Sequence, residues 1–567
     1  MDLTCCLYIL VSFHVVRSVH GNCPDECLCP DPRVVRCSGG TVTKVPSSIP
    51  ADTERLDISY TNITIFTSND FHAINESLQF LIANTPELTE IKPGAFDSLT
   101  NLKVLLLTQT KLQKIPTRLF RNMVNLEKLI LNKNKLQNIS HDMFSTLTSL
   151  NDLNLEKNQL NYIPEGAFSQ LVNLQSLSLA WNNIASFSQK TFQNLTTLRF
   201  LRLQKNGLRQ IPPGSFDHLA NLEELSLQGN QIEHLPADLF SKQPNLKKLF
   251  LSNNHISRLP EGIFLNLPVL SDLTLFENCL VNISSGVWGP MPLRELWLYN
   301  NKLVHIADRA FNNLTQLQLL VLSRNHISTI SRDAFRGLVA LGEVSVHTNK
   351  LTSLEEGTFN GLVALQNISL ENNNLKSLPG NLFQNLPILQ NLDLHNNSLE
   401  SLPHELLNSL DAITEIILYD NPWKCDMDTY PLRKWMKLNP LKVSSITQTA
   451  CFSPASLKGT PIVDVRDENV TSTTVITQQY FTMTSTTRST FTPIFTTPWK
   501  SSPSHNSGDN GIEKEKGGGL TKEALIIIIV LICTVVISSL VICIACKRKK
   551  RQSSGNLNPT STRNSVI

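Results

Sequence analysis

Leucine and other large apolar residues recur along this chain with a period of 24 residues. The template is L-x-x-L-x-L-x-x-N-x-L, and Leu126, Leu129, Leu131, Asn134 and Leu136 fill one copy of it. Its asparagines stand at positions 134, 158, 182, 206, 230, 254, 278, 301, 325, 349, 373, 397 and 421, so one step alone is 23 residues. Thirteen copies in phase predict a solenoid in which each repeat packs against its neighbours.

Within each repeat the second and third leucines alternate with polar residues, the pattern of a strand with one buried face. Three earlier turns carry Thr61, Pro86 and Thr110 at the asparagine position, which raises the expected number of strands to sixteen. We expect the strands to form a parallel sheet on the concave side of a horseshoe, with asparagine amides bonded to backbone groups of adjacent turns. The predicted fold class is an α/β leucine-rich repeat solenoid.

One phenylalanine in each repeat occupies the segment expected on the convex side, and Trp288 replaces it once. We interpret these aromatic residues as a buried spine and not as a cofactor site. They are Phe96, Phe120, Phe144, Phe168, Phe192, Phe216, Phe240, Phe264, Phe311, Phe335, Phe359 and Phe383.

The cysteines stand where the solenoid ends need covers. Cys23, Cys27, Cys29 and Cys37 precede the first repeat, and Cys425 and Cys451 follow the last. Zinc is the alternative for four cysteines this close, but a secreted context without a C-x-x-C pair favours disulfides. We expect a Cys425 to Cys451 bridge, whereas the spacing leaves three pairings open among the first four. Cys279 is left over, either free or bridged to another molecule.

Two apolar segments predict the cellular location. Residues 7–16 are too short to span a bilayer and resemble a signal peptide. Residues 524–546 form 23 uncharged residues, long enough to cross a bilayer, and the basic run 547–551 marks the cytosolic side. A nuclear import signal is the alternative reading of that run. We expect a single-pass type I plasma-membrane protein with an extracellular N-terminus.

The expected segments follow from these features. They are a signal peptide (1–21), an N-terminal cysteine-rich cap (22–52), the repeats (53–420), a C-terminal cap (421–463), a Ser/Thr-rich stalk (464–523), the transmembrane helix (524–546) and a cytoplasmic tail (547–567). Nine N-x-S/T sequences are candidate N-glycosylation sites, at Asn62, Asn75, Asn138, Asn194, Asn282, Asn313, Asn367, Asn396 and Asn469.

Charge and motif content restrict the function. The 50 Lys and Arg nearly balance the 47 Asp and Glu, and six of the basic residues lie in the last 21 positions, so nucleic acid is not an expected partner. No H-E-x-x-H, G-x-S-x-G or phosphate-binding glycine loop occurs. We expect a binding protein and not an enzyme, with no cofactor and no metal.

Most side chains at the concave strand positions are small or polar, but four neighbouring repeats have large apolar residues there. They are Phe250, Phe276, Trp297, Tyr299, Leu319 and Val321. An exposed apolar patch with Trp and Tyr anchors is typical of a ligand-binding site. The alternative is that neighbouring side chains or a glycan cover the rings. Trp181 and Phe200 form a weaker, separate candidate.

The flanks and the central repeats resemble the extracellular leucine-rich repeat family, to which platelet glycoprotein V and the carboxypeptidase N regulatory subunit belong. The resemblance rests on the C-P-x-x-C-x-C run from Cys23, on 421–426 (N-P-W-K-C-D), and on 273–278, 289–299, 431–435 and 451–454. It differs in one respect, because Met427 stands where that family commonly has another cysteine.

This resemblance implies a cell-surface protein that binds extracellular matrix proteins of the fibronectin, laminin or collagen class and influences adhesion and migration. The alternative is a membrane-tethered scaffold or co-receptor for a soluble protein. An innate signalling receptor would need a larger cytosolic domain than 21 residues.

The C-terminus supplies two further candidates. Ser565 and Ile567 match the tail pattern that cytosolic PDZ proteins bind by β-augmentation. Cys543 and Cys546 lie beside the basic run and are palmitoylation candidates. An inert tail is the alternative.

Overall fold

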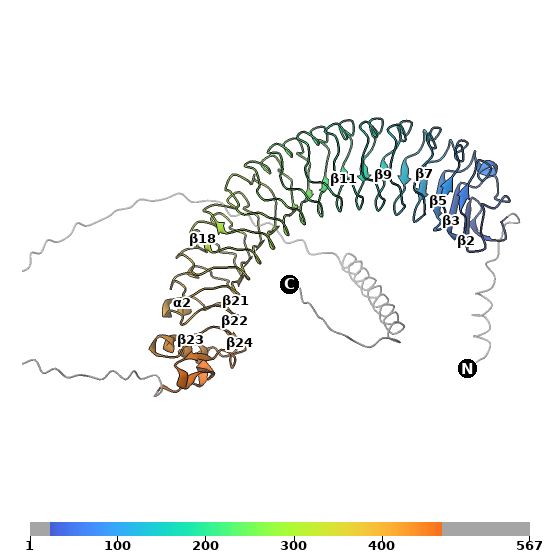
Figure 1. Cartoon of the computed structure of the whole chain (residues 1–567). Helices are drawn as coiled ribbons and strands as arrows, with labels where there is room; N and C mark the ends of the chain where they lie inside the picture. The colour runs from blue at the N-terminus through green and yellow to red at the C-terminus, as the bar shows by residue number, and fades with distance from the viewer. Residues whose placement is uncertain (1–22, 468–567) are drawn as a thin grey trace, which may run out of the picture. The chain divides into compact units, whose positions relative to one another are not determined.

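The computed structural model describes residues 23–467, which stack into an arc of repeats (Figure 1). One short parallel strand per repeat lines the concave side, so the solenoid and its sixteen repeat strands are confirmed. No helix within residues 23–467 is long and apolar enough to cross a membrane. The expected signal peptide, transmembrane segment and cytoplasmic tail lie outside the described residues, as does the stalk beyond residue 467.

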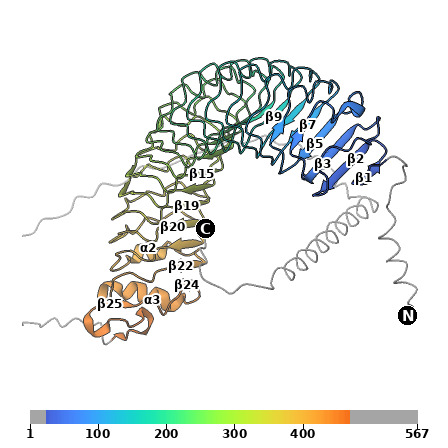
Figure 2. The same ribbon diagram turned by 45° about the vertical axis from the view of Figure 1, so that its right-hand side comes forward.

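The concave sheet contains nineteen strands, the sixteen repeat strands together with β1, β2 and β24 from the caps. Figure 2 shows them along the inner edge of the arc. Their bounds are β1 (Cys27–Asp31), β2 (Val34–Gly39), β3 (Arg55–Thr61), β5 (Phe80–Asn84), β7 (Val104–Leu107), β8 (Lys128–Ile130), β9 (Asp152–Asn154), β10 (Ser176–Ser178), β11 (Phe200–Arg202), β12 (Glu224–Ser226), β13 (Lys248–Phe250), β14 (Asp272–Thr274), β15 (Glu295–Trp297), β17 (Leu319–Val321), β19 (Glu343–Ser345), β20 (Asn367–Ser369), β21 (Asn391–Asp393), β22 (Glu415–Ile417) and β24 (Val443–Ser444).

The strand register reproduces the sequence period. Leu177 of β10 lies opposite Leu201 of β11, 24 residues later. The 23-residue step appears where Leu273 of β14 lies opposite Leu296 of β15. Equivalent residues of successive repeats therefore form straight rows across the sheet.

The convex side consists of turns, which corrects the helical half of the expected α/β class. Single turns surround each spine residue; for example, the Leu147 N–H donates to the Phe144 carbonyl at 3.1 Å. A 24-residue repeat leaves only this short segment, which is too short for a helix to be stable by itself, and most repeats form a single turn there. Short strands precede it in some repeats: β4 (Ile65–Phe66) with β6 (Glu90–Ile91), and β16 (His305–Ile306) with β18 (Thr329–Ile330). A helix, α2 (His404–Asn408), occurs in the last full repeat.

Two internal features hold the repeats together. The template asparagines form the expected ladder: the Asn278 Nδ2 amide donates to the Leu251 and Leu275 carbonyls, and its Oδ1 accepts from the Ile256 N–H at 3.0 Å. The aromatic spine is buried as expected, each of its thirteen rings being at most 1% exposed. Most neighbouring spine rings stack, as Phe335 and Phe359 do at 6.0 Å.

Disulfides close both ends of the solenoid. Cys27 lies opposite Cys37 in the antiparallel β1–β2 hairpin and is bonded to it, while Cys23 is bonded to Cys29. This is one of the three pairings that the sequence left open. Cys425 is bonded to Cys451, and the half-buried Cys279 is free.

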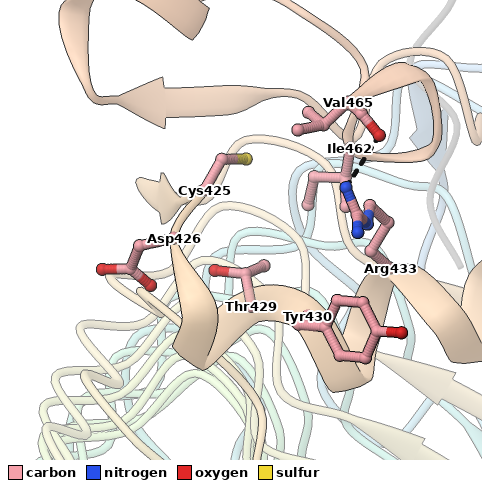
Figure 3. Close-up of a pocket in the computed structure, with 7 residues that line it drawn as sticks. All are labelled: Cys425, Asp426, Thr429, Tyr430, Arg433, Ile462 and Val465. Carbon is pink, nitrogen blue, oxygen red and sulfur yellow. Dashed lines mark hydrogen bonds between the residues drawn. The ribbon is translucent and has the colours of Figure 1, made fainter. Parts of the chain in front are cut away.

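The C-terminal cap is built on helix α3 (Tyr430–Leu438) and the pair β23 (Trp423–Lys424) and β25 (Cys451–Ser453). A cavity of about 10 Å³ lies there, lined by Cys425, Asp426, Thr429, Tyr430, Arg433, Ile462 and Val465 (Figure 3). It holds a single water at most. The buried Arg433 guanidinium donates to the Val465 carbonyl at 2.8 Å and pairs with Asp467, so this residue ties the end of the cap to α3.

Candidate ligand-binding surface

The strand pattern places the candidate residues on the concave face. In β13, β14, β15 and β17 the central leucine is buried, and the residues on either side of it face away from the core. Phe250, Thr274, Trp297 and Val321 follow one another in register across these four strands. Two positions further along the chain, Phe276 and Tyr299 occupy the next row.

Three of the predicted aromatic residues form one cluster, which we call the aromatic cluster. The Phe276 and Tyr299 rings stack with centroids 4.7 Å apart and an angle of 7° between their planes. The Trp297 ring meets Tyr299 edge-on at 6.2 Å. The Trp297 Nε1–H donates to the Glu295 carboxylate at 3.1 Å, which fixes the indole against its own strand.

The six predicted residues are less exposed than expected and are not all in contact. Val321 is buried, with 9% exposure, and the other five are half-buried. The exposure of the aromatic residues is low because the Phe276 and Tyr299 rings stack, and each ring covers one face of the other. Phe250 is separated from Trp297 by Thr274, while Leu319 lies between Glu295 and Glu343 in the register. The structure thus brings together Phe276, Trp297 and Tyr299, with Val321 beside them.

Charged residues surround the aromatic cluster. Lys248, Asp272, Glu295 and Arg324 are exposed, and Glu277 is half-buried. Burial raises the pKa of the Tyr299 hydroxyl, and the nearby Glu277 raises it further while Arg324 opposes the change. The Tyr299 hydroxyl is therefore neutral in the physiological range and can donate a hydrogen bond to a ligand.

The row that begins with Phe276 and Tyr299 continues through polar residues that sequence reasoning did not single out. Ser323, His347, Glu371, His395 and Tyr419 occupy the equivalent place in the following repeats. The His395 Nδ1–H donates to Asp393 Oδ1 at 2.7 Å, and the His395 ring stacks on Tyr419 at 4.8 Å. The sequence could have revealed this row, because the residues are spaced 24 positions apart and therefore occupy the same place in successive repeats.

Trp181 and Phe200, the second candidate, lie among cations. Trp181 is 47% exposed, and the Lys157 and Lys205 ammonium groups lie 5.3 and 5.8 Å from the centre of its ring. Phe200 is half-buried, with the Arg199 and Arg202 guanidinium groups 5.7 and 5.8 Å from its ring. Arg199 and Arg202 also pair with Glu223 and Glu224, whereas Lys205 forms no ion pair within residues 23–467. The cations therefore surround Trp181 with less compensating charge than Phe200.

The candidate glycosylation sites differ in accessibility. Asn62, Asn138, Asn194, Asn282 and Asn396 are exposed, Asn75 and Asn313 are half-buried, and Asn469 lies outside the described residues. Asn367 is on the concave strand β20, where its Nδ2 amide donates to Glu343 Oε2 at 3.2 Å and its Oδ1 accepts from Asn391 at 2.7 Å. A glycan on Asn367 would be attached to the nitrogen that makes the first of these bonds.

The repeats match known families directly. Residues 64–199 match the BspA type leucine rich repeat region in six copies. The leucine rich repeat model matches residues 173–232, 220–280, 244–293, 291–349, 340–399 and 363–422. The chain belongs to the leucine-rich repeat family.

Among curated relatives, human leucine-rich repeat-containing protein 15 is 47% identical over 45 residues, which is 8% of each chain. Leucine-rich repeat-containing G-protein coupled receptor 5A of Xenopus laevis is 37% identical over 107 residues, 18% of this chain and 12% of the receptor. Mouse amphoterin-induced protein 2 is 33% identical over 104 residues, 18% of this chain and 20% of that protein. The matches thus span a fifth or less of these relatives' length.

Two solved structures share the fold. The TLR13–ssRNA13 complex aligns with a TM-score of 0.60 and 26% identity, covering 74% of this chain and 60% of that one. A leucine-rich repeat protein of Leptospira interrogans aligns with a TM-score of 0.51 and 29% identity, covering 71% of this chain and 93% of that one.

Proposed function

We propose that this protein is a single-pass cell-surface binding protein that uses the aromatic cluster to bind an extracellular matrix protein of the fibronectin, laminin or collagen class. The observation that carries the proposal is the contact of Phe276, Trp297 and Tyr299 on neighbouring concave strands. The core does not need these rings, since each strand already buries its leucine.

The geometry of the aromatic cluster suits a protein ligand. Large aromatic anchors surrounded by a charged rim are the usual centre of a protein interface. The rings are also held in place before binding, by stacking and by the Trp297 to Glu295 hydrogen bond, so less side-chain entropy is lost when a ligand binds. A ligand that inserts an apolar or proline-rich segment would bury the remaining exposed parts of the rings.

The test is binding of the purified full chain to fibronectin, laminin and collagen by surface plasmon resonance. Trp297→Ala should weaken binding to the true ligand about thirtyfold, because truncating an interface anchor typically costs about 2 kcal/mol. Phe452→Ala is the control, since Phe452 is a 55% exposed ring on the C-terminal cap. Equal affinity of Trp297→Ala and the wild type for every matrix protein that binds would exclude the aromatic cluster as the site.

A soluble protein partner is the second candidate, in which the chain acts as a membrane-tethered scaffold or co-receptor. The negative charge of the concave face from β19 to β22 favours it, because Glu343, Asp393 and Glu415 lie there without a lysine or arginine on the same strands. If none of the matrix proteins binds while a soluble basic protein does, this second function replaces the first.

The membrane anchor and the tail remain part of the proposal. We infer that residues 524–546 span the plasma membrane, that Cys543 and Cys546 accept palmitate, and that Ser565 and Ile567 engage a cytosolic PDZ protein. One residue added after Ile567 should abolish capture of a PDZ protein from cell lysate, because the free carboxylate moves away from its binding loop. Unchanged capture would exclude the PDZ assignment.

A further inference from the structure

Three lysines and one tryptophan occupy equivalent places in four successive repeats. Lys133, Lys157, Trp181 and Lys205 each stand three residues after the end of a strand, from β8 to β11, and all four are exposed. We call this row the basic ridge. Adjacent strands are about 4.8 Å apart, so the row spans roughly 14 Å along the edge of the concave face.

The backbone fixes the basic ridge rigidly. All four residues have a positive φ, between 54° and 57°, the left-handed conformation. Each backbone N–H donates to a carbonyl of the next repeat, for example Lys157 to Ala180 at 2.9 Å and Trp181 to Gln204 at 2.9 Å. Because every member has the same conformation and the same inter-repeat bond, the Cα–Cβ directions are parallel.

Contacts inside the basic ridge hold the ammonium groups near the indole. Lys157 and Lys205 approach the Trp181 ring from the repeats on either side, at 5.3 and 5.8 Å. The next position in the row is Gly229, where a Cβ atom would come within 2.6 Å of the Lys205 Cδ. Glycine thus leaves the room that the Lys205 stem occupies.

The positive charge of the basic ridge is largely uncompensated. Lys157 pairs with Glu156 at 3.3 Å, whereas no carboxylate of residues 23–467 lies within ion-pair distance of Lys133 or Lys205. The segment that contains the ridge is basic as well, since residues 133–205 hold seven Lys and Arg against four Asp and Glu. Residues 343–420, near the other end of the solenoid, hold two against ten.

We propose that the basic ridge is a binding site for a linear sulfated polysaccharide. Such a polymer carries anionic groups at regular intervals, which matches lysines repeated at the strand spacing, and its sugar rings have an apolar face that can cover the exposed part of Trp181. Nucleic acid fits less well, because binding to single strands relies on several aromatic platforms for successive bases and this ridge has one. The site is separate from the aromatic cluster and is independent of the function proposed above.

The experiment measures binding of the purified full chain to a heparin decasaccharide at physiological ionic strength. The triple variant Lys133→Gln, Lys157→Gln, Lys205→Gln should lose about tenfold or more in affinity, since each lost surface ion pair contributes a modest amount. The matched control replaces three other exposed lysines, Lys302→Gln, Lys350→Gln and Lys376→Gln, and should lose less than about twofold. Trp181→Ala should weaken binding without lowering the melting temperature, because the ring is exposed.

Three further measurements determine whether the assignment holds. The fully desulfated decasaccharide should not bind, and Trp297→Ala should bind heparin as the wild type does. Equal losses in the two triple variants would show a response to total charge alone and would overturn the proposal. Tighter binding of a single-stranded oligoribonucleotide of equal charge would also overturn it, in favour of a nucleic-acid site.

Discussion

The spine and the aromatic cluster place aromatic residues on opposite sides of the same repeats. Both consist of stacked rings, as in Phe264 with Trp288 (5.4 Å, 18°) and Phe276 with Tyr299 (4.7 Å, 7°). The spine rings are at most 1% exposed, whereas the rings of the cluster are half-buried. Stacking geometry therefore does not separate a ring of the core from a ring that a ligand could reach, but the side of the repeat and the residual exposure do.

Two tryptophans, nine residues apart, show the difference in their N–H groups. The Trp288 Nε1–H donates to the buried Ala310 carbonyl at 2.8 Å, in the next repeat. The Trp297 Nε1–H donates to the exposed Glu295 carboxylate on its own strand. The first bond holds two repeats together, and the second orients a side chain that a ligand can reach.

The largest expected effect is on the spine. Phe311→Ala should destabilise the protein by about 3–5 kcal/mol, because it removes a fully buried ring that stacks on Trp288 and Phe335 and leaves a cavity. Phe276→Ala should cost less than about 1.5 kcal/mol, since water already reaches that ring. Urea unfolding followed by circular dichroism measures both. Equal losses would mean that the cluster is part of the core.

A smaller loss of stability is expected when either tryptophan is replaced, and the loss should differ between Trp288 and Trp297. Trp288→Phe keeps an aromatic ring but leaves the Ala310 carbonyl without its donor, so we expect a loss of about 1–3 kcal/mol. Trp297→Phe should cost less than about 0.5 kcal/mol, because the Glu295 carboxylate can bond to water instead. A similar loss in both variants, measured by the same unfolding curves, would remove the distinction between the two bonds.

The repeat architecture could be predicted because the template occurs thirteen times in the sequence. Each copy places leucines, asparagine and phenylalanine at fixed intervals, and the sheet register, the asparagine ladder and the spine all follow from that period. The turns of the convex side could not be predicted as easily, since a phenylalanine between polar residues is compatible with either a turn or a short helix. In that segment the length of the repeat determines whether a turn or a helix forms.

The candidate site was harder to predict, because its properties depend on contacts across repeats. The sequence placed Phe276, Trp297 and Tyr299 on one face, but only their stacking reduces the exposure of each ring. The pairing of Cys27 with Cys37 depends on the β1–β2 register, which spacing alone leaves open. The basic ridge could be found from sequence by aligning the repeats and comparing the residue before each template asparagine.

The polar half of the row that contains Phe276 and Tyr299 holds a buried carboxyl group. Glu371 Oε1 lies 3.7 Å from His347 Nδ1, and within residues 23–467 its Oε2 is buried without a hydrogen-bond partner. Burial raises the pKa of Glu371 to about 7, and the nearby Asp393 raises it while His395 opposes this. Burial and the Arg324 charge lower the pKa of His347, so at neutral pH this histidine supplies no compensating positive charge.

The smallest expected effect is at Glu371. It tests whether the polar residues of this row, unlike Phe276 and Tyr299, make the stability of the protein depend on pH. Glu371→Gln should raise the stability at pH 8 by about 1 kcal/mol, because the wild type then holds a desolvated carboxylate that water screens only in part. The gain should shrink as the pH falls through about 7 and vanish below the ordinary value of 4.5, where the carboxyl is protonated in both the folded and the unfolded state. Glu400→Gln, at an exposed carboxylate, is the control and should leave the stability unchanged at both pH values. A Glu371→Gln gain that is the same at pH 8 and pH 4 in thermal melts would show that burial of charge is not its cause.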